Sequence, residues 1–218
     1  MKKLLLASVI ALALLSLSAT TGHADFIFTV SVNTSGLIND SSLTGPFGID
    51  FQLVQGDGSV INTATISNIN LGTGGAAVGS PSLTNSMGSL TNGVTLDDSN
   101  FFSDFNQQFT PGSSLTFTVD LTTNVGATAP DEFSFAILQN YGTANVGEIP
   151  TTDPSGLNTL ITVNITSSTP SIMSYGGTDG DPPAPQVNVV PEPSTLMLTL
   201  TGLLGFAGAA WRRRQRSA

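Results

Sequence analysis

Apolar residues recur at every second position in several stretches of the chain, which is the period of a β-strand that buries one face. The clearest case is 115–122, where Leu115, Phe117, Val119 and Leu121 alternate with threonines and an aspartate. The same alternation predicts strands over 26–32, 47–55, 133–139 and 157–166. Strands are therefore predicted to be the dominant elements of the chain.

The segments 47–55 and 59–69 are separated by Gly56-Asp57-Gly58, a composition typical of a tight turn. This spacing predicts that the two segments form a β-hairpin. Within the second segment the apolar positions change parity, which predicts a β-bulge near Ser67 and Asn68. Weaker signals predict short strands over 76–78, 94–96 and 100–105.

No segment before residue 195 shows helical spacing over three turns. Short strands separated by Gly, Pro, Asn and Asp are typical of an antiparallel two-sheet β-sandwich or jelly roll. The sequence therefore predicts one all-β domain over 25–175. Residues 176–189, rich in Gly, Pro and Asp, are predicted to form a semi-extended linker that holds this domain off a membrane.

The N-terminus has the three parts of a secretory signal peptide. Lys2 and Lys3 precede an apolar stretch over 4–17, and small residues follow near Ala24. Residues 1–24 are therefore predicted to be a signal peptide that signal peptidase removes between Ala24 and Asp25. Cleavage a few residues earlier, or retention as a signal anchor, are the alternatives.

The C-terminus, residues 190–218, combines an apolar run over 195–211 with a basic tail over 212–218. An apolar run of this length lies near the lower limit of the roughly 17–25 residues that cross a bilayer. It is predicted to be a single transmembrane helix. Under the positive-inside rule its basic end stays in the cytoplasm and the upstream residues are exported. The basic cluster consists of Arg212, Arg213, Arg214 and Arg216.

Charge is distributed very unevenly along the chain, whose net charge is −9. Between Asp25 and Val190 there is no Lys, Arg, His, Cys or Trp, whereas carboxylates occur throughout. Salt bridges within this region are therefore impossible, and stability must come from apolar burial and hydrogen bonds. Nucleic acid is excluded as a partner of this region because no side chain there can neutralise phosphates.

The same composition argues against an enzyme. Without His, Lys, Arg or Cys, neither a Ser/His/Asp nor a Cys/His arrangement can form in the domain. Only carboxylate chemistry of the glycosidase type remains, and no Trp is available there to stack on a sugar ring. The chain is predicted to be non-enzymatic, with a carboxylate hydrolase as a third alternative. The carboxylates that could supply such a pair are Asp97, Asp98, Asp104, Asp131 and Glu132.

The segment Val190-Pro191-Glu192-Pro193-Ser194, followed by the apolar run and the arginines, resembles the tail of PEP-CTERM exported proteins of Gram-negative bacteria. The resemblance covers only the residues from Val190 onward, with the signal peptide in agreement. It implies recognition by an exosortase and cleavage near Pro191-Glu192-Pro193. The protein would then be anchored in the inner membrane before processing and reach the cell surface or extracellular matrix afterwards. The alternative is an ordinary membrane anchor without processing.

The family resemblance also implies an association with exopolysaccharide and the biofilm matrix. The leading expectation is thus a non-enzymatic surface or matrix protein. The alternative is a carbohydrate-binding module that acts on extracellular polysaccharide, for which Tyr141 and Tyr175 are the candidate surface aromatics.

No cofactor is expected, except that calcium is a hypothesis. Hard cations prefer several oxygen ligands, and the densest supply lies in Asp97, Asp98 and Asp104. A second cluster is Asp179-Gly180-Asp181. Neither cluster has the EF-hand spacing, and the alternative for the first is a solvated acidic turn.

Overall fold

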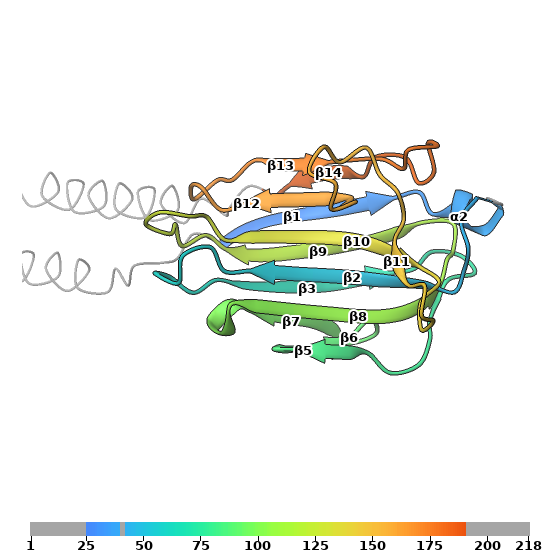
Figure 1. The fold of residues 1–218 in the computed structure, drawn as a ribbon, viewed down its shortest axis with the longest axis horizontal. Coiled ribbons are helices and arrows are strands. Elements are labelled where there is room, and N and C mark those ends of the chain that lie inside the picture. Colours follow the sequence, from blue (N-terminus) through green and yellow to red (C-terminus); the bar gives the residue numbers. More distant parts are fainter. Residues whose placement is uncertain (1–24, 40–41, 191–218) are drawn as a thin grey trace, which may run out of the picture.

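The computed structural model describes residues 25–39 and 42–190, which form two antiparallel sheets packed face to face (Figure 1). The prediction of an all-β, two-sheet fold is confirmed. The predicted signal peptide and transmembrane helix lie outside the described residues. Within the described part of the chain, no helix is both long enough and apolar enough to cross a membrane.

Sheet A contains six strands in the order β14-β1-β9-β3-β7-β6. Alternate residues of these strands face the interior: along β9 the apolar residues are buried and the polar residues between them are partly exposed. The bounds are β1 Asp25–Val32, β3 Thr63–Asn70, β6 Ser86–Ser89, β7 Gly93–Asp97, β9 Leu115–Thr122 and β14 Gln186–Val189.

Sheet B contains eight strands, six of them in the order β13-β12-β10-β2-β8-β4, with β11 paired to β10 and β5 paired to β8. Two short helical turns complete the described elements, α2 (Ser35–Asn39) and the 3-10 turn η1 (Asp98–Asn100). The strand bounds are β2 Phe47–Val54, β4 Ala76–Ala77, β5 Ser82–Thr84, β8 Phe102–Thr110, β10 Glu132–Gln139, β11 Gly147–Glu148, β12 Ile161–Asn164 and β13 Ile172–Ser174.

Phe51, at the centre of β2, is fully buried in the core between the sheets. Its ring lies 5.1 Å from that of Phe117 in sheet A and 5.4 Å from that of Phe135 in sheet B, measured between centroids. Each buried aromatic side chain contributes roughly 1.5–3 kcal/mol through loss of contact with water. Because no salt bridge can form between Asp25 and Val190, this aromatic cluster is a main source of the stability of the sandwich.

The predicted hairpin between 47–55 and 59–69 is wrong. β2 lies in sheet B, between β10 and β8, whereas β3 lies in sheet A, between β9 and β7. The turn that starts at Gly56 therefore crosses from one sheet to the other. β2 is buried along most of its length, which suits a central strand better than one arm of a hairpin. The predicted bulge is confirmed, because the β3–β9 register shifts between Ser67 and Asn70.

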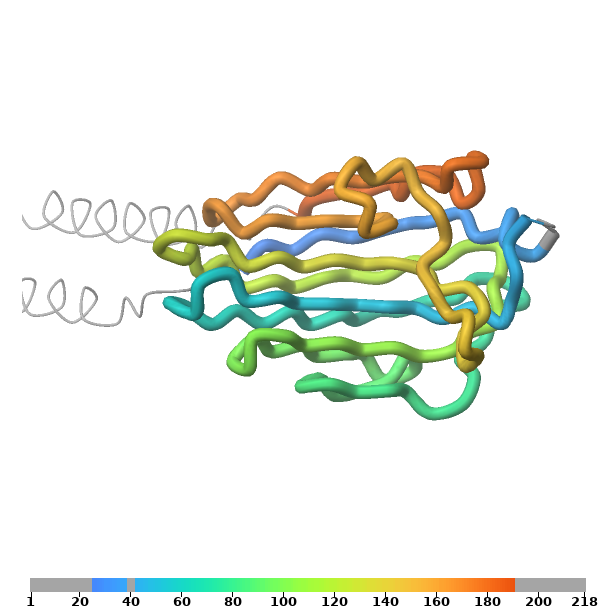
Figure 2. The backbone as a smooth tube through the Cα atoms, viewed as in Figure 1, coloured from blue at the N-terminus to red at the C-terminus, as the bar shows by residue number. Residues whose placement is uncertain are grey.

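The predicted linker over 176–189 is wrong for its last four residues, which form β14. Phe28 and Val30 of β1 pair with Val189 and Val187 of β14, and the amide of Val190 donates to the carbonyl of Ile27 at 2.8 Å. The only apolar signal was two valines after a proline-rich stretch, too short to indicate a strand. β14 forms because β1 offers a free edge. The sandwich thus extends to Val190, and its first and last described residues lie at the same end (Figure 2).

Candidate functional site

Two strands of sheet B place a group of polar side chains on its outer face. Because Phe51 of β2 and Phe105 of β8 point into the core, their neighbours point outward. The outward group, here called the sheet B quartet, consists of Asp50, Gln52, Asp104 and Asn106. Across the two strands Asp50 pairs with Asn106 and Gln52 pairs with Asp104, so the two carboxyl groups lie on a diagonal.

Within the quartet each amide serves the carboxylate on its own strand. Gln52 Nε2 donates to Asp50 Oδ2 at 2.8 Å, and Asn106 Nδ2 donates to Asp104 Oδ2 at 2.6 Å. The remaining oxygens, Oδ1 of Asp50, Asp104 and Asn106, are buried and have no amide or hydroxyl donor. A buried oxygen without a hydrogen-bond donor destabilises the fold. A proton or a cation bound to these three oxygens would therefore be stabilising.

Burial raises the pKa of Asp50 to about 8, and the charge of Asp104 and a hydrogen bond with Asp104 add to the effect. The hydrogen bond from Gln52 opposes the rise, and the charge of Glu148 on β11 supports it. Burial also raises the pKa of Asp104, against hydrogen bonds from Asp50 and Asn106. The two carboxyl groups therefore share a proton when no other cation is present.

Tyr141 lies beside the quartet. Its ring occupies the space in which a Cβ atom on Gly48 would stand, and its amide donates to the carbonyl of Pro46 at 2.8 Å. Burial raises the pKa of the Tyr141 hydroxyl, and the charges of Asp104 and Asp50 raise it further. The glycine in β2 thus lets an aromatic ring pack against the sheet next to the carboxyl pair.

A second carboxyl pair lies where the β2–β3, β7–β8 and β9–β10 connections meet. Asn62 Nδ2 donates to Asp131 Oδ2 at 2.6 Å, and the Asn62 amide donates to Asp98 Oδ1 at 2.8 Å. All three residues are fully buried. Burial raises the pKa of Asp98 to about 7, opposed by the Asn62 amide and reinforced by the hydrogen bond and charge of Asp131.

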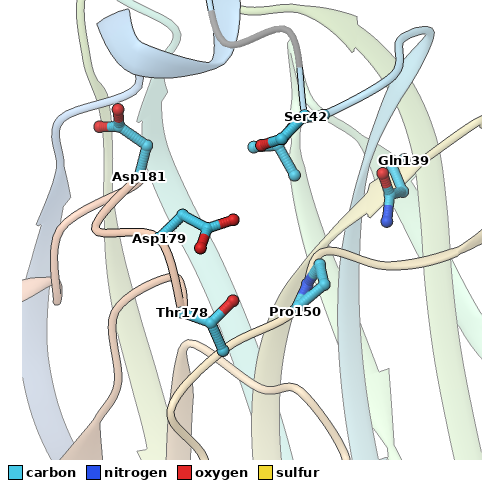
Figure 3. A pocket seen from close by; sticks show the side chains of 7 residues that line it. Ser42, Gln139, Pro150, Thr178, Asp179 and Asp181 are labelled. Atoms are coloured by element: carbon cyan, nitrogen blue, oxygen red, sulfur yellow. The ribbon is translucent and has the colours of Figure 1, made fainter.

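A cavity of about 70 Å³ lies between the end of β10 and the β13–β14 connection (Figure 3). Its lining includes Asp179 and Asp181, the second acidic cluster identified in the sequence, together with Ser42 and Gln139 from distant segments. The volume suits a few water molecules. These two aspartates therefore belong to the folded domain and not to a free spacer.

The three aspartates of the calcium hypothesis have separate surroundings. Asp97 caps η1 by accepting from the Ser99 amide at 2.8 Å, whereas Asp98 turns inward to Asn62 and Asp104 belongs to the sheet B quartet. Within the described ranges there is no group of three or more acidic side chains that could hold a metal. The spacing of Asp97, Asp98 and Asp104 thus does not bring them together as one set of ligands.

The two candidate tyrosines are both half-buried. Tyr141 lies beside Asp50 and Asp104, whereas Tyr175 follows β13 and lies near Asp153 and Glu132, whose charges add to the effect of burial in raising its pKa. They face different acids and do not flank one polar group. Carbohydrate binding through them stays a prediction.

Sequence reasoning missed Asp50 and Asn62. The strand period places Asp50 outward, but outward positions are normally solvated, and only the folded chain buries this one to 4% exposure. The spacing of these acids and amides could have indicated the group. Asp50 and Gln52 are two residues apart, as are Asp104 and Asn106, so each acid has an amide beside it on the same face of its strand. Asn62 gave no such signal.

A family model for the PEP-CTERM protein-sorting motif matches residues 189–214. The chain carries a PEP-CTERM sorting motif. The match includes the predicted motif residues Pro191, Glu192 and Pro193. These residues, the arginine cluster and Ala24 all lie outside the described residues. No curated protein and no solved structure matches the chain. The PEP-CTERM motif begins at the last residue of β14, so sorting signal and sandwich are contiguous.

Proposed function

We propose that this PEP-CTERM chain is an exported, non-enzymatic protein of the cell surface or extracellular matrix, sorted by an exosortase that cuts near Pro191-Glu192-Pro193. The observation that carries the proposal is the sorting motif at residues 189–214. Signal peptidase acts first, at the other end of the chain. The inner membrane is then a stage on the route, and the sandwich is the part delivered.

The sandwich supports this role through its chemistry. Fourteen of the fifteen Asp and Glu residues, all except Glu192, lie between Asp25 and Val190, where no cationic side chain occurs. A surface of one sign keeps an exported protein dispersed and repels nucleic acid. Asp50 and Asp104 lie on one face of sheet B, and each accepts a hydrogen bond from the amide of Gln52 or Asn106 on its own strand, which favours a structural over a catalytic role for these acids.

The test is the intact mass of the mature protein purified from its native host. We expect a mass that lacks residues 1–24 and most of residues 195–218. Replacement of Pro191-Glu192-Pro193 by three alanines should retain the C-terminal segment and leave the protein in the membrane fraction. The control is Pro183→Ala, an exposed proline outside the motif, which should be processed normally. A wild-type mass that retains residues 195–218 would contradict the proposal.

Carbohydrate binding is the second candidate, favoured by one observation. Tyr141 combines a partly exposed ring with neighbouring carboxyl and amide groups of the sheet B quartet, the types of group that sugar sites employ. The full-length protein should then retain the host's own polysaccharide in a pull-down, and Tyr141→Ala should abolish retention while Tyr175→Ala preserves it. Retention that is absent, or unaffected by Tyr141→Ala, would count against this candidate.

A further inference from the structure

We propose that the sheet B quartet is a calcium site, with Oδ1 of Asp50, Asp104 and Asn106 as its protein ligands. These three oxygens lie at neighbouring outward positions of β2 and β8. Asp50 of β2 pairs directly with Asn106 of β8, and Asp104 lies two residues before Asn106 on β8. Directly paired residues have Cβ atoms about 4.5–5.5 Å apart, which lets their side chains converge on one ion.

The hydrogen bonds leave these oxygens available. Asp104 Oδ2 accepts from the Asn106 amide nitrogen and Asp50 Oδ2 accepts from Gln52, so each carboxylate keeps one oxygen for another partner. The Asn106 nitrogen is thereby committed, and its oxygen must be an acceptor. All three Oδ1 atoms are buried without a donor, and Asp50 is only 4% exposed.

A shared proton cannot satisfy this arrangement. One proton between two carboxyl groups engages their two oxygens and leaves the Asn106 oxygen unpaired. Calcium takes six to eight oxygen ligands and would engage all three oxygens at once. No lysine or arginine between Asp25 and Val190 can fill the same place. Because Asp104 and Asn106 are only partly buried, water can complete the coordination shell.

The Asp98–Asp131 pair provides a contrast within the same molecule. There both Asp131 oxygens accept hydrogen bonds, from Asn62 and from the Gly56 amide, and among that pair only Asp98 Oδ2 is without a donor. A proton on Asp98 Oδ2 is enough to satisfy that oxygen. We therefore assign the cation to the sheet B quartet and not to this second pair.

Terbium luminescence on the full-length protein in detergent tests the assignment, because Tyr141 lies beside the quartet and can sensitise a bound lanthanide. We expect saturable emission that calcium competes away. Tyr141→Phe should remove most of the emission, and Tyr175→Phe should retain it. Asp50→Asn should weaken binding by about tenfold or more, whereas Asn106→Asp, which adds a third carboxylate, should strengthen it by a similar factor.

The matched control is Asp120→Asn, which removes a partly buried carboxylate from β9 in the other sheet and should leave terbium affinity unchanged. Circular dichroism verifies that each variant is folded. Absence of saturable emission from the folded wild-type protein would overturn the proposal. So would a folded Asn106→Asp variant with no gain in affinity, or an Asp120→Asn variant that weakens binding as much as Asp50→Asn does.

Discussion

Asn62 joins Asp98 to Asp131 in the interior: its backbone amide donates to Asp98 Oδ1 at 2.8 Å and its side-chain amide donates to Asp131 Oδ2 at 2.6 Å, and both acids are fully buried. They come from the β7–β8 and β9–β10 connections, and no cation lies between Asp25 and Val190 to neutralise them. Burial therefore favours the protonated form of Asp98.

This pair predicts that the protein becomes less stable as pH rises. The pKa of Asp98 is about 7 in the folded state, against an ordinary 3.8, so the folded state holds a proton that the unfolded state has lost. The contribution of Asp98 to stability is fully present below about pH 4 and falls by about 1.4 kcal/mol per pH unit until about pH 7. Urea unfolding with chelator present, at a series of pH values, measures the slope.

The control for this pH dependence is Asp98→Asn, whose amide imitates the protonated acid. The free energy of unfolding of this variant should fall less steeply with pH than that of the wild type, and the difference in slope corresponds to one proton. The pKa of Asp50, about 8, contributes in the same direction and is unaffected by the change, so the difference isolates Asp98. Equal slopes for the two proteins would refute the assignment of the proton to Asp98.

Asn62 is predicted to be among the most sensitive polar positions. Its side chain donates to the Asn124 carbonyl and to Asp131, and accepts from the Asn124 amide and the Thr122 hydroxyl. Asn62→Ala leaves several buried groups unpaired and should lower the free energy of unfolding by about 2–4 kcal/mol. The exposed Asn100 offers the comparison, since Asn100→Ala should stay within about 0.5 kcal/mol. Similar losses for both variants would show that Asn62 does not organise the three connections.

Substitution of two phenylalanines should have very different effects on stability. Phe51→Ala removes the ring that joins the aromatic clusters of both sheets and should cost about 3–5 kcal/mol. Phe101 is 62% exposed and has φ 71°, a region that glycine adopts without strain. Phe101→Gly should therefore be neutral or slightly stabilising in thermal unfolding. A large loss of stability from Phe101→Gly would show that its side chain makes an important contact.

Gly48→Ala tests the packing of Tyr141 on sheet B. The added methyl group would collide with the Tyr141 ring and displace it, at a cost of about 1–3 kcal/mol. The pKa of the Tyr141 hydroxyl should then fall toward its ordinary value, because burial and the neighbouring carboxylates raise it. Spectrophotometric titration in a Tyr175→Phe background measures it. Gly147→Ala is the matched control, since a Cβ atom at Gly147 meets no atom within 4 Å.

Local patterns were good guides to individual strands and poor guides to their partners. The alternation around Phe117 predicted β9, and the parity change near Ser67 predicted the bulge, because side-chain direction depends only on the local backbone. The hairpin prediction failed because β2 pairs with β8 and β10, contacts between distant segments that turn composition does not encode.

The sequence by itself determined the all-β class, the absence of cations between Asp25 and Val190, and the sorting motif, all of which depend on residue type and local order. Only the tertiary structure decided that β14 closes the edge of β1 and that Asp50 meets Asp104. The reason is physical. A strand's period is a property of its own backbone, whereas the burial and partners of a side chain depend on which strands lie beside it.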